Sequence, residues 1–454
     1  MTLNEYKQVV CGRRVCAIGI GVSNVPLIEF LISCGANVTA CDKKEKSQLG
    51  EVAERLENLG VTLICGEDYL KNLDFEIIFK TPGMRPDVKE LEDARKNGAV
   101  VTSEMELFFE LCPCKIIAVT GSDGKTTTTT LIYETLKKAG YTCHLGGNIG
   151  KPLIGDIEKI TANDMAVLEL SSFQLFTMRK SPDVAVITNL APNHLDWHTD
   201  LDEYLEAKKN IFKFQSGENT LVLNHDNDVT DGLDKESAAD VRKFSRTGNV
   251  ENGVMLVGSD IVYVSNGKHE RIMEKSDIRL PGEHNVENYM AMAAAVKDFV
   301  KPEIIKEVAL SFGGVHHRIE FVREVGGVKF YNDSIASSPS RTTAALNSFD
   351  EKIILIAGGY DKKIPFDDLG KLICKKVKNL VLVGHTAEKI KAAVDNAGGV
   401  PTQVCSDFKE AVLAAYRTAK EGDIVVLSPA CASFDLFKNF EERGNLFKQI
   451  VNEI

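Results

Sequence analysis

The chain has 454 residues, of which 44% are hydrophobic, and a formal net charge of −11 at pH 7. A chain of this length predicts about three domains of roughly 150 residues each. The negative charge disfavours non-specific binding of nucleic acid, so a polyanionic ligand would depend on local lysines, arginines and backbone N–H groups. We expect small-molecule substrates and no nucleic-acid partner.

Targeting and cysteine patterns exclude further classes of protein. The chain has no apolar run of about 18 residues, and its N-terminal sequence lacks the apolar core of a signal peptide. The 11 cysteines form no CxxC pair, and an odd number argues against a disulfide framework. We expect a cytoplasmic monomer with reduced thiols and no membrane span.

The first third alternates predicted strands and helices. Strand 15–18 enters a helix through the turn Gly19-Ile-Gly-Val-Ser-Asn24, and a second strand, 37–41, ends at Asp42. The arrangement resembles the GxGxxG dinucleotide-binding motif, but Asn24 occupies the position of the third glycine. NAD, another nucleotide-like ligand and a purely structural turn therefore remain open.

A further predicted strand, 77–79, ends in the turn Thr81-Pro82-Gly83-Met84. Such a turn places backbone N–H groups at the carboxyl edge of a sheet, where open α/β sheets bind ligands. The domain is expected to close after strand 100–101 and helix 104–110, with Cys112-Pro113-Cys114 as the linker.

The segment 115–130, KIIAVTGSDGKTTTTT, carries the strongest motif. An apolar strand, a glycine loop and a helix-compatible tract give the context of a phosphate-binding loop, although GxxGK[ST] is shorter than the usual GxxxxGK[ST]. Gly121 and Gly124 let the backbone N–H groups point inward, Lys125 supplies a charge, and the Thr126 hydroxyl can bind Mg²⁺. The alternative is a glycine turn with a surface lysine; we predict that the loop binds a nucleoside triphosphate.

Polar residues follow the next predicted strands. Glu169 interrupts the apolar strand 165–170 near its carboxyl end, and a glutamate is rarely buried unless it is paired or binds a metal. Beside a phosphate loop it is a candidate Mg²⁺ ligand, and the alternative is an ion pair with a core arginine. A preceding glycine-rich loop offers Asn148 as donor and acceptor. His194, beyond strand 184–188, is a candidate metal ligand or substrate contact.

The helix predicted to begin with Asp200 and Glu203 contains an unexpected lysine. Apolar residues recur with helical spacing over 201–212, and Lys208 lies on the same face. Burial lowers the pKa of a lysine and makes its amine nucleophilic, so it can react with CO₂ to give a carbamate that binds metal like a carboxylate. The alternative is a lysine whose stem covers the apolar stripe while its charge stays in water.

The last third repeats the strand–helix pattern. Strands are predicted at 328–331, 353–357, 380–383 and 424–427. They indicate a parallel, Rossmann-like sheet without a GxGxxG motif.

Together these motifs resemble the Mur ligases, the ATP-dependent amide-forming enzymes of peptidoglycan precursor synthesis, over nearly the whole chain. The matching segments are Thr120-Gly-Ser-Asp-Gly-Lys125-Thr126, Gly146-Gly-Asn148-Ile-Gly150, Glu169-Leu-Ser-Ser-Phe-Gln174, Asn193-His194-Leu-Asp196, Lys208, His284-Asn285-Val-Glu-Asn288 and His317-Arg318-Ile-Glu320. The segment 428–444 further resembles the branch of the family that adds D-glutamate.

The resemblance implies a ligase that joins UDP-N-acetylmuramoyl-L-alanine to D-glutamate through an acyl phosphate, with ATP and two Mg²⁺ ions. The nearer alternative is another ligase of the superfamily, which adds a different amino acid or makes folate polyglutamates. The more distant one, resting on residues 19–24 alone, is a nicotinamide-dependent dehydrogenase or a nucleotide-sensing regulator. The implied fold is α/β in three domains: a Rossmann-like UDP-substrate domain at 1–112, a central P-loop ATPase-like domain at 113–313 and a Rossmann-like amino-acid domain at 314–454.

The resemblance also assigns roles to single residues. Those expected at ATP are Gly121, Ser122, Asp123, Gly124, Lys125, Thr126, Thr127, Asn285, Asn288, Arg318 and Asp333. Those expected at the UDP substrate are Gly21, Val22, Ser23, Asp42, Thr81, Pro82, Gly83, Asn148 and Ser171. Those expected at D-glutamate are Lys362, Ser433 and Phe440. The expected catalytic residues are Lys125, Glu169, His194 and Lys208, and the expected metal ligands are Thr126, Glu169, His194 and carbamylated Lys208.

Two positions depart from the family pattern. Ile335 stands where many relatives carry a lysine near the phosphates, so this contact is either absent or replaced, for example by Arg341. Asn193 stands where an aspartate is common. Neither change affects the predicted ATP loop or the Mg²⁺ ligands.

Overall fold

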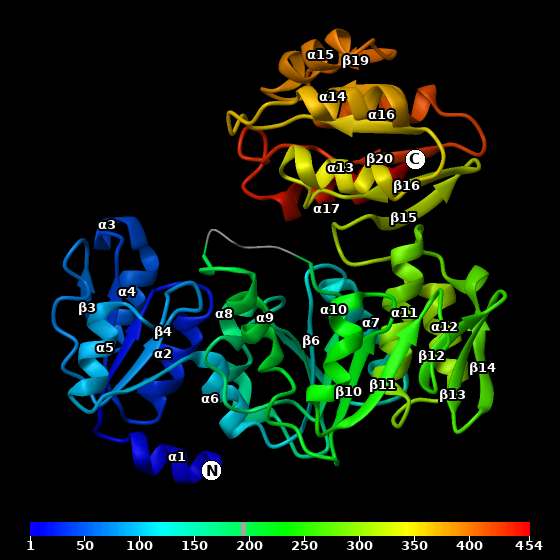
Figure 1. Ribbon diagram of the computed structural model, residues 1–454. Coiled ribbons are helices and arrows are strands. Elements are labelled where there is room, and N and C mark those ends of the chain that lie inside the picture. Colours follow the sequence, from blue (N-terminus) through cyan, green and yellow to red (C-terminus); the bar gives the residue numbers. More distant parts are fainter. Residues whose placement is uncertain (192–196) are drawn as a thin grey trace. The chain divides into compact units, whose positions relative to one another are not determined.

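The computed structural model describes residues 1–191 and 197–454, which contain three β-sheets with helices packed against them (Figure 1). The α/β class and the sheet of each third agree with the prediction. Within the described residues, no helix combines the length and the apolar character needed to cross a bilayer. The domain boundaries after residues 112 and 313 stay predictions.

The N-terminal sheet is parallel, with the strand order β3-β2-β1-β4-β5. Its strands are β1 (Arg14–Ile18), β2 (Asn37–Asp42), β3 (Thr62–Cys65), β4 (Ile77–Lys80) and β5 (Val100–Thr102). Its helices are α1 (Leu3–Val10), α2 (Asn24–Ser33), α3 (Lys46–Leu49), α4 (Glu51–Asn58), α5 (Lys89–Lys96) and α6 (Glu104–Leu111). The sequence analysis did not predict β3, an edge strand that is only partly buried.

Alternate residues of β1 face two different cores. Val15 and Ala17 pack in the cluster that includes α2 and α6, whereas Cys16 and Ile18 pack in the cluster that includes α5. Because both faces of the strand are buried, its sequence is continuously apolar rather than alternating.

The central sheet has the order β14-β13-β12-β11-β10-β9-β6-β8-β7, and only the pairs β12–β13 and β13–β14 are antiparallel. Its strands are β6 (Lys115–Thr120), β7 (Cys143–Gly147), β8 (Met165–Glu169), β9 (Val184–Ile187), β10 (Thr220–Asn224), β11 (Asp240–Ser245), β12 (Asn252–Val257), β13 (Asp260–Ser265) and β14 (Lys268–Glu274). Its helices include α7 (Lys125–Lys138), η1 (Leu153–Lys159), α8 (Ser172–Leu175), α9 (Leu201–Lys209), α10 (Asp228–Asp231), α11 (Glu283–Val296) and α12 (Pro302–Ser311). Strand β6 lies between β9 and β8, so the glycine loop at its end is flanked by the exits of both strands.

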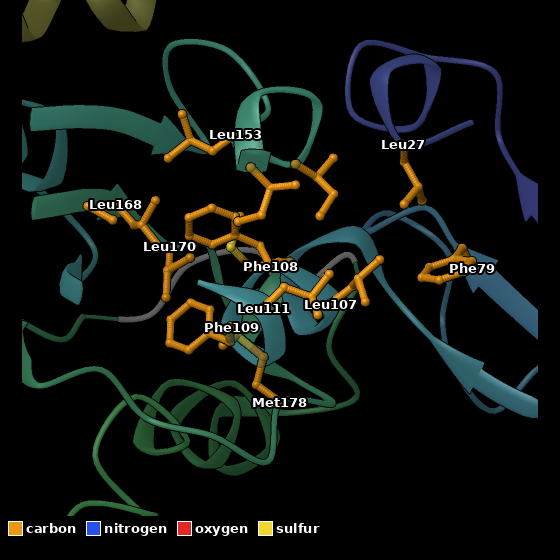
Figure 2. Close-up of a cluster of buried hydrophobic side chains, with 14 of the residues drawn as sticks. Leu27, Phe79, Leu107, Phe108, Phe109, Leu111, Leu153, Leu168, Leu170 and Met178 are labelled. Carbon is orange, nitrogen blue, oxygen red and sulfur yellow. The ribbon is translucent and has the colours of Figure 1, made fainter. Parts of the chain in front are cut away.

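The N-terminal and central sheets belong to one compact unit, Met1–Asp277 with Val286–Val308. A shared hydrophobic core joins them, and Figure 2 shows part of it. Leu27 of α2 and Phe79 of β4 belong to the same cluster as Phe108 of α6, Leu153 of η1 and Leu168 of β8, and all five are nearly fully buried. This burial stabilises the contact between the two sheets.

The second unit comprises Ile278–Asn285 and Ala309–Ile454. Its sheet has the order β15-β16-β20-β17-β18-β19, with only β15–β16 antiparallel. The strands are β15 (Glu320–Val325), β16 (Val328–Asn332), β17 (Ile353–Ala357), β18 (Val377–Leu382), β19 (Thr402–Val404) and β20 (Ile424–Leu427), and the helices are α13 (Pro339–Asn347), α14 (Asp367–Lys376), α15 (Ala387–Asn396), α16 (Phe408–Thr418) and α17 (Phe440–Glu453). The carboxyl ends of β16, β20 and β17 are neighbours, and this edge collects the polar loops predicted from the sequence.

Candidate active site

The glycine loop between β6 and α7 has a backbone that only glycine adopts easily. Gly121 has φ 147° and Gly124, the N-cap of α7, has φ 76°. A Cβ atom at Gly121 would lie 2.0 Å from the Thr188 hydroxyl, and one at Gly124 would lie 2.4 Å from the side-chain oxygen of Asn288. Both glycines are therefore required by conformation and by space.

Hydrogen bonds fix this loop to the chain that leaves β9. The Ser122 N–H donates to the Asn189 carbonyl and the Asp123 N–H donates to the Asn189 side-chain oxygen, both at 2.9 Å. The Thr188 hydroxyl donates to the Asp123 carbonyl at 2.5 Å. The Ser122 hydroxyl lies 2.9 Å from the Tyr204 hydroxyl of α9. The loop is thus held in shape from outside before any ligand binds.

Lys125 and Thr126 form the first turn of α7, where backbone N–H groups and the helix dipole favour an anion. The Lys125 Nζ donates to the carbonyl oxygens of Gly121 and Ser122, both at 2.9 Å. The hydroxyl of the half-buried Thr126 has no hydrogen-bond partner among the described residues. The loop therefore has the charge and the donors that a phosphate group needs.

Glu169 is the last residue of β8 and is 2% exposed. Its Oε1 accepts a hydrogen bond of 2.8 Å from the Asn148 side chain, whereas its Oε2, also buried, has no partner among the described residues. No described arginine pairs with Glu169, so the alternative of an ion pair with a core arginine does not hold among the described residues. A buried carboxylate oxygen without a donor is costly unless a cation occupies the space beside it.

Lys208 lies on α9 with only 2% of its surface exposed. Its Nζ donates to the Thr120 hydroxyl at 3.1 Å and to the Gly121 carbonyl at 2.9 Å, so the alternative of a charge in water is excluded. Burial lowers the pKa of this amine well below its usual value, the charge of Lys125 lowers it further, and Glu169 acts in the opposite direction. The predicted helix is shorter than expected: α9 ends at Lys209, before residues 211 and 212.

The predicted metal ligands fit Mg²⁺ in their chemistry. Thr126 and Glu169 each offer an oxygen that no described residue engages, and oxygen ligands are those that Mg²⁺ prefers. Within residues 1–191 and 197–454, no three His, Cys, Asp or Glu side chains gather as a metal site would require. His194, the other predicted ligand, lies outside the described residues.

Asn285 and Asn288 lie one turn apart on α11 and are 7% and 5% exposed. The Asn288 side-chain oxygen accepts a hydrogen bond of 3.2 Å from Thr128 on α7, and the Asn285 side chain donates to the Pro281 carbonyl at 2.6 Å. Asn288 is thereby brought beside the glycine loop.

Ser171, predicted to contact the UDP substrate, is the N-cap of α8. Its hydroxyl accepts a hydrogen bond from the Gln174 N–H.

The residues predicted to hold the UDP group lie at the carboxyl edge of the N-terminal sheet. Neighbouring strands β2, β1 and β4 bring together Asp42, the turn 21–23 and the turn 81–83. A Cβ atom at Gly19 would lie 3.0 Å from that of Thr81, so the two turns touch. The Val22 side chain is 81% exposed at this edge.

Two contacts at this edge argue against a dinucleotide site and leave another nucleotide-like ligand open. The buried Asn24 side chain donates to the carbonyl oxygens of Ile18 and Gly19, at 2.8 and 3.1 Å, and so fills the place of the third glycine. The Asp42 carboxylate accepts from the N–H groups of Ile20 and Lys44, at 2.6 and 2.8 Å.

The second unit has its own polar edge. Asp333, beyond β16, accepts hydrogen bonds from the Ser428 hydroxyl at 2.7 Å and from the Ile319 N–H at 3.3 Å. Burial raises the pKa of Asp333 to about 7, against the lowering effect of those bonds and of the more distant Arg318 and Arg341.

The residues predicted to bind D-glutamate surround the same edge. Lys362 is exposed and its Nζ donates to the Ser337 carbonyl at 3.3 Å, whereas Ser433 is 2% exposed. Phe440 begins α17 and meets the His317 ring edge-on, with centroids 5.9 Å apart. The backbone of the β17 loop bonds that of the β20 loop, because the Tyr360 N–H donates to the Ala432 carbonyl at 2.9 Å.

The structure describes Ile335, one of the two positions that depart from the family pattern. Ile335 is held by its N–H bond to the His317 carbonyl at 3.0 Å. The exposed Arg341 reaches the Ile335 carbonyl at 3.5 Å, a weak contact that leaves its charge available at this edge. Asn193 lies outside the described residues.

Comparison with known proteins decides the family. Residues 119–296 match the Mur ligase middle domain, and residues 317–431 match the Mur ligase glutamate ligase domain. The chain belongs to the Mur ligase family. It is 55% identical over 460 residues to the UDP-N-acetylmuramoylalanine–D-glutamate ligase of Acetivibrio thermocellus, with 100% of this chain and 99% of that protein covered. Proteins of the same name from Ruminiclostridium cellulolyticum and Clostridium kluyveri are 51% and 52% identical, with at least 99% of both chains covered.

Solved structures of Mur ligases share the fold at lower identity. A UDP-N-acetylmuramate-alanine ligase from Thermotoga maritima aligns with a TM-score of 0.58 and 18% identity, covering 97% of this chain and 99% of that one. A UDP-N-acetylmuramoyl-L-alanyl-D-glutamate–2,6-diaminopimelate ligase aligns with a TM-score of 0.58 and 19% identity, covering 98% and 94%. This identity supports the architecture of the Mur ligase and not its substrate.

One residue of this Mur ligase was not singled out from the sequence. Arg443 on α17 is 2% exposed, and its guanidinium donates to the carbonyl oxygens of Ser334, Cys431 and Ala432 and to the Ser334 hydroxyl. It therefore ties the exit of β16 to the loop that contains Ser433. The sequence could have indicated its burial, because Arg443, Phe447 and Ile450 have the spacing of residues on one face of a helix.

Proposed function

We propose that this chain is an ATP-dependent ligase that forms an amide bond between UDP-N-acetylmuramoyl-L-alanine and D-glutamate, a step in the synthesis of peptidoglycan precursors. The observation that carries the proposal is the identity of 51–55% over the full length of relatives that bear this name. The geometry of the glycine loop supports the binding of ATP in this reaction. The cytoplasmic location and the monomeric state stay predictions.

The chemistry requires activation of a carboxyl group, because a carboxylate does not react with an amine at neutral pH. The substrate carboxylate would attack the γ-phosphorus of ATP, release ADP and form an acyl phosphate. The amine of D-glutamate would then attack the acyl carbon, lose a proton and displace phosphate. Lys125 at the start of α7 would stabilise the charge on the transferring phosphoryl group.

The oxygen ligands support a role for Mg²⁺ in this reaction. Bound Mg²⁺ would neutralise charge on the ATP phosphates. Thr126 and Glu169 would hold one ion through the oxygens that lack described partners, and His194 with Lys208 would hold a second. Asn148 would fix the Glu169 carboxylate through its hydrogen bond of 2.8 Å.

Lys208 suits this role only after modification, since an ammonium repels a metal ion. Its lowered pKa leaves a larger fraction of the amine neutral and nucleophilic. The neutral nitrogen would attack the carbon of CO₂, forming an N–C bond, and the loss of one proton would leave a carbamate anion. A carbamate oxygen can bind a cation as a carboxylate does.

The remaining predicted residues would bind the two other substrates. The turns 21–23 and 81–83, with Asp42, would hold the UDP group at the N-terminal edge, and Ser171 would contact the same substrate beside Asn148. In the second unit, Lys362, Ser433 and Phe440 would hold D-glutamate, because a cation is suited to a dianionic amino acid. Asn285, Asn288, Arg318 and Asp333 would contact ATP.

The proposal is tested by phosphate release from the purified chain with ATP, Mg²⁺ and UDP-N-acetylmuramoyl-L-alanine, against a panel of amino acids. We expect release with D-glutamate and little with L-glutamate, L-lysine or diaminopimelate. Preference for another amino acid would support a different ligase of the superfamily. Release without the UDP substrate would contradict the proposal.

A further inference from the structure

Arg85 lies in the loop that follows β4, four residues beyond Thr81, and its guanidinium is fully engaged. Its Nε and one Nη bond the Asp87 carboxylate, at 2.9 and 2.7 Å. Both Nη atoms bond Glu203 on α9, at 3.0 and 2.9 Å, and one also donates to the Trp197 carbonyl at 2.9 Å. The five N–H groups of an arginine therefore all have acceptors here.

Trp197 makes a second contact with the same loop. Its indole N–H donates to the Gly83 carbonyl at 2.9 Å. The Arg85 guanidinium lies over the indole ring at 5.0 Å and over the Phe176 ring at 5.7 Å. Cation–π contact adds to the hydrogen bonds when it is partly shielded from water, and the Arg85 side chain is 24% exposed.

Glu203 is fixed from the other side. Its Oε2 accepts from the Thr199 N–H at 2.9 Å and lies 3.3 Å from the buried Nδ1 of His198. The Glu203 carboxylate therefore forms no capping box with Asp200, and the Asp200 side chain caps the helix alone by accepting from the Glu203 N–H. Its side chain instead joins α9 to the loop after β4.

We propose that Arg85 and Trp197 are positioning residues for the nucleotide-sugar substrate. They hold residues 81–83, the proposed UDP contacts, against the start of the helix that carries Lys208. The reactive carboxyl of a substrate bound at the first sheet must reach the phosphate loop of the second, so the spacing of these two elements affects how well it binds. This inference rests on the proposed function.

The closing experiment compares Trp197→Phe, which keeps a ring but removes the N–H, and Arg85→Lys, which keeps the charge but removes the two-pronged bond to Glu203. In each we expect the KM for UDP-N-acetylmuramoyl-L-alanine to rise about three- to tenfold, as expected for one or two lost hydrogen bonds. The KM values for ATP and D-glutamate should stay within about twofold. Equal changes in all three KM values, or none, would overturn the positioning role.

A binding measurement gives an independent readout. Trp197 is the chain's single tryptophan, so its emission reports this contact directly. Adding the UDP substrate alone to the wild type should change the emission, and Arg85→Lys should raise the fitted Kd by the same factor as the KM. An emission that does not respond while the substrate is turned over would contradict the proposal.

Lys209→Met is the matched control, because Lys209 on the same helix pairs with Glu206 and Glu236, both at 2.9 Å, and has no ion pair or hydrogen bond with the loop after β4 in the described residues. It should leave all KM values unchanged. Circular dichroism would confirm that each variant is folded. A wild type that releases no phosphate with D-glutamate would instead contradict the proposed function, and the emission titration would still test the positioning role.

Discussion

The side-chain nitrogen of Lys208 lies 2.9 Å from the carbonyl oxygen of Gly121, at the point where the glycine loop leaves its strand. A lysine that is 2% exposed has little water to stabilise its charge, and the nearby Lys125 opposes a second cation. The arrangement therefore favours the neutral amine and its conversion to an anion.

Lys208→Ala should be nearly inactive, because it removes the proposed carbamate beside Glu169. A small added carboxylate should restore part of the activity by filling the same space. Depletion of CO₂ from the buffers should lower the activity of the wild type, and its return should restore it. An unmodified ammonium in a structure of the Mg²⁺- and substrate-bound enzyme, with CO₂ present, would exclude the carbamate.

Lys125→Ala should abolish amide formation while the protein stays folded. The loss of one cation from a phosphoryl-transfer site lowers the rate by about 10²–10³ or more. Phosphate release measures the loss, and the unfolding midpoint measures the fold. Lys137→Ala, near the C-terminal end of the same helix and paired with Glu134, should keep full activity. Wild-type turnover in Lys125→Ala would remove this residue from the mechanism.

Lys362→Ala should raise the KM for D-glutamate far more than the KM for ATP. A charge-assisted hydrogen bond to a carboxylate is worth about tenfold or more in affinity. The adjacent Lys363, also exposed, provides the control substitution to alanine. An equal rise in both KM values would place Lys362 at the phosphates, where it would compensate for Ile335.

Glu104 predicts a pH dependence of stability that is independent of the active site. It is 5% exposed, its Oε1 lacks a partner among the described residues, and burial raises its pKa to about 7. Between about pH 4.5 and 7 the folded chain keeps a proton that the unfolded chain releases, so stability falls as pH rises, by roughly 3 kcal/mol in all.

Glu104→Gln should abolish this loss. The variant and the wild type should unfold at similar temperatures near pH 5, and the variant should unfold at the higher temperature near pH 8. Glu110, an exposed residue of the same helix that pairs with Lys180, provides the control. The difference in unfolding temperature between Glu110→Gln and the wild type should be the same at pH 5 and pH 8. Parallel midpoints of Glu104→Gln and wild type from pH 5 to 8 would show that Glu104 ionises normally.

Much of the fold could be predicted because its signals are local. The strands at β1, β6, β8 and β17 are short apolar runs that end in glycine or polar residues, and the structure confirms each of them. The partly buried strand β3 was missed because only its pairing with β2 defines it.

The sequence by itself determined the glycine loop between a strand and a helix, the buried Glu169 at a strand end and the inward face of Lys208. Each depends on the chemistry and periodicity of a few consecutive residues. Only the tertiary structure decided that Asn148 is the partner of Glu169, that Arg443 holds the loop of Ser433, and that Arg85 meets Glu203 across 118 positions of the chain. These contacts follow from which strands, helices and sheets become neighbours in the folded chain, and local periodicity contains no information about that.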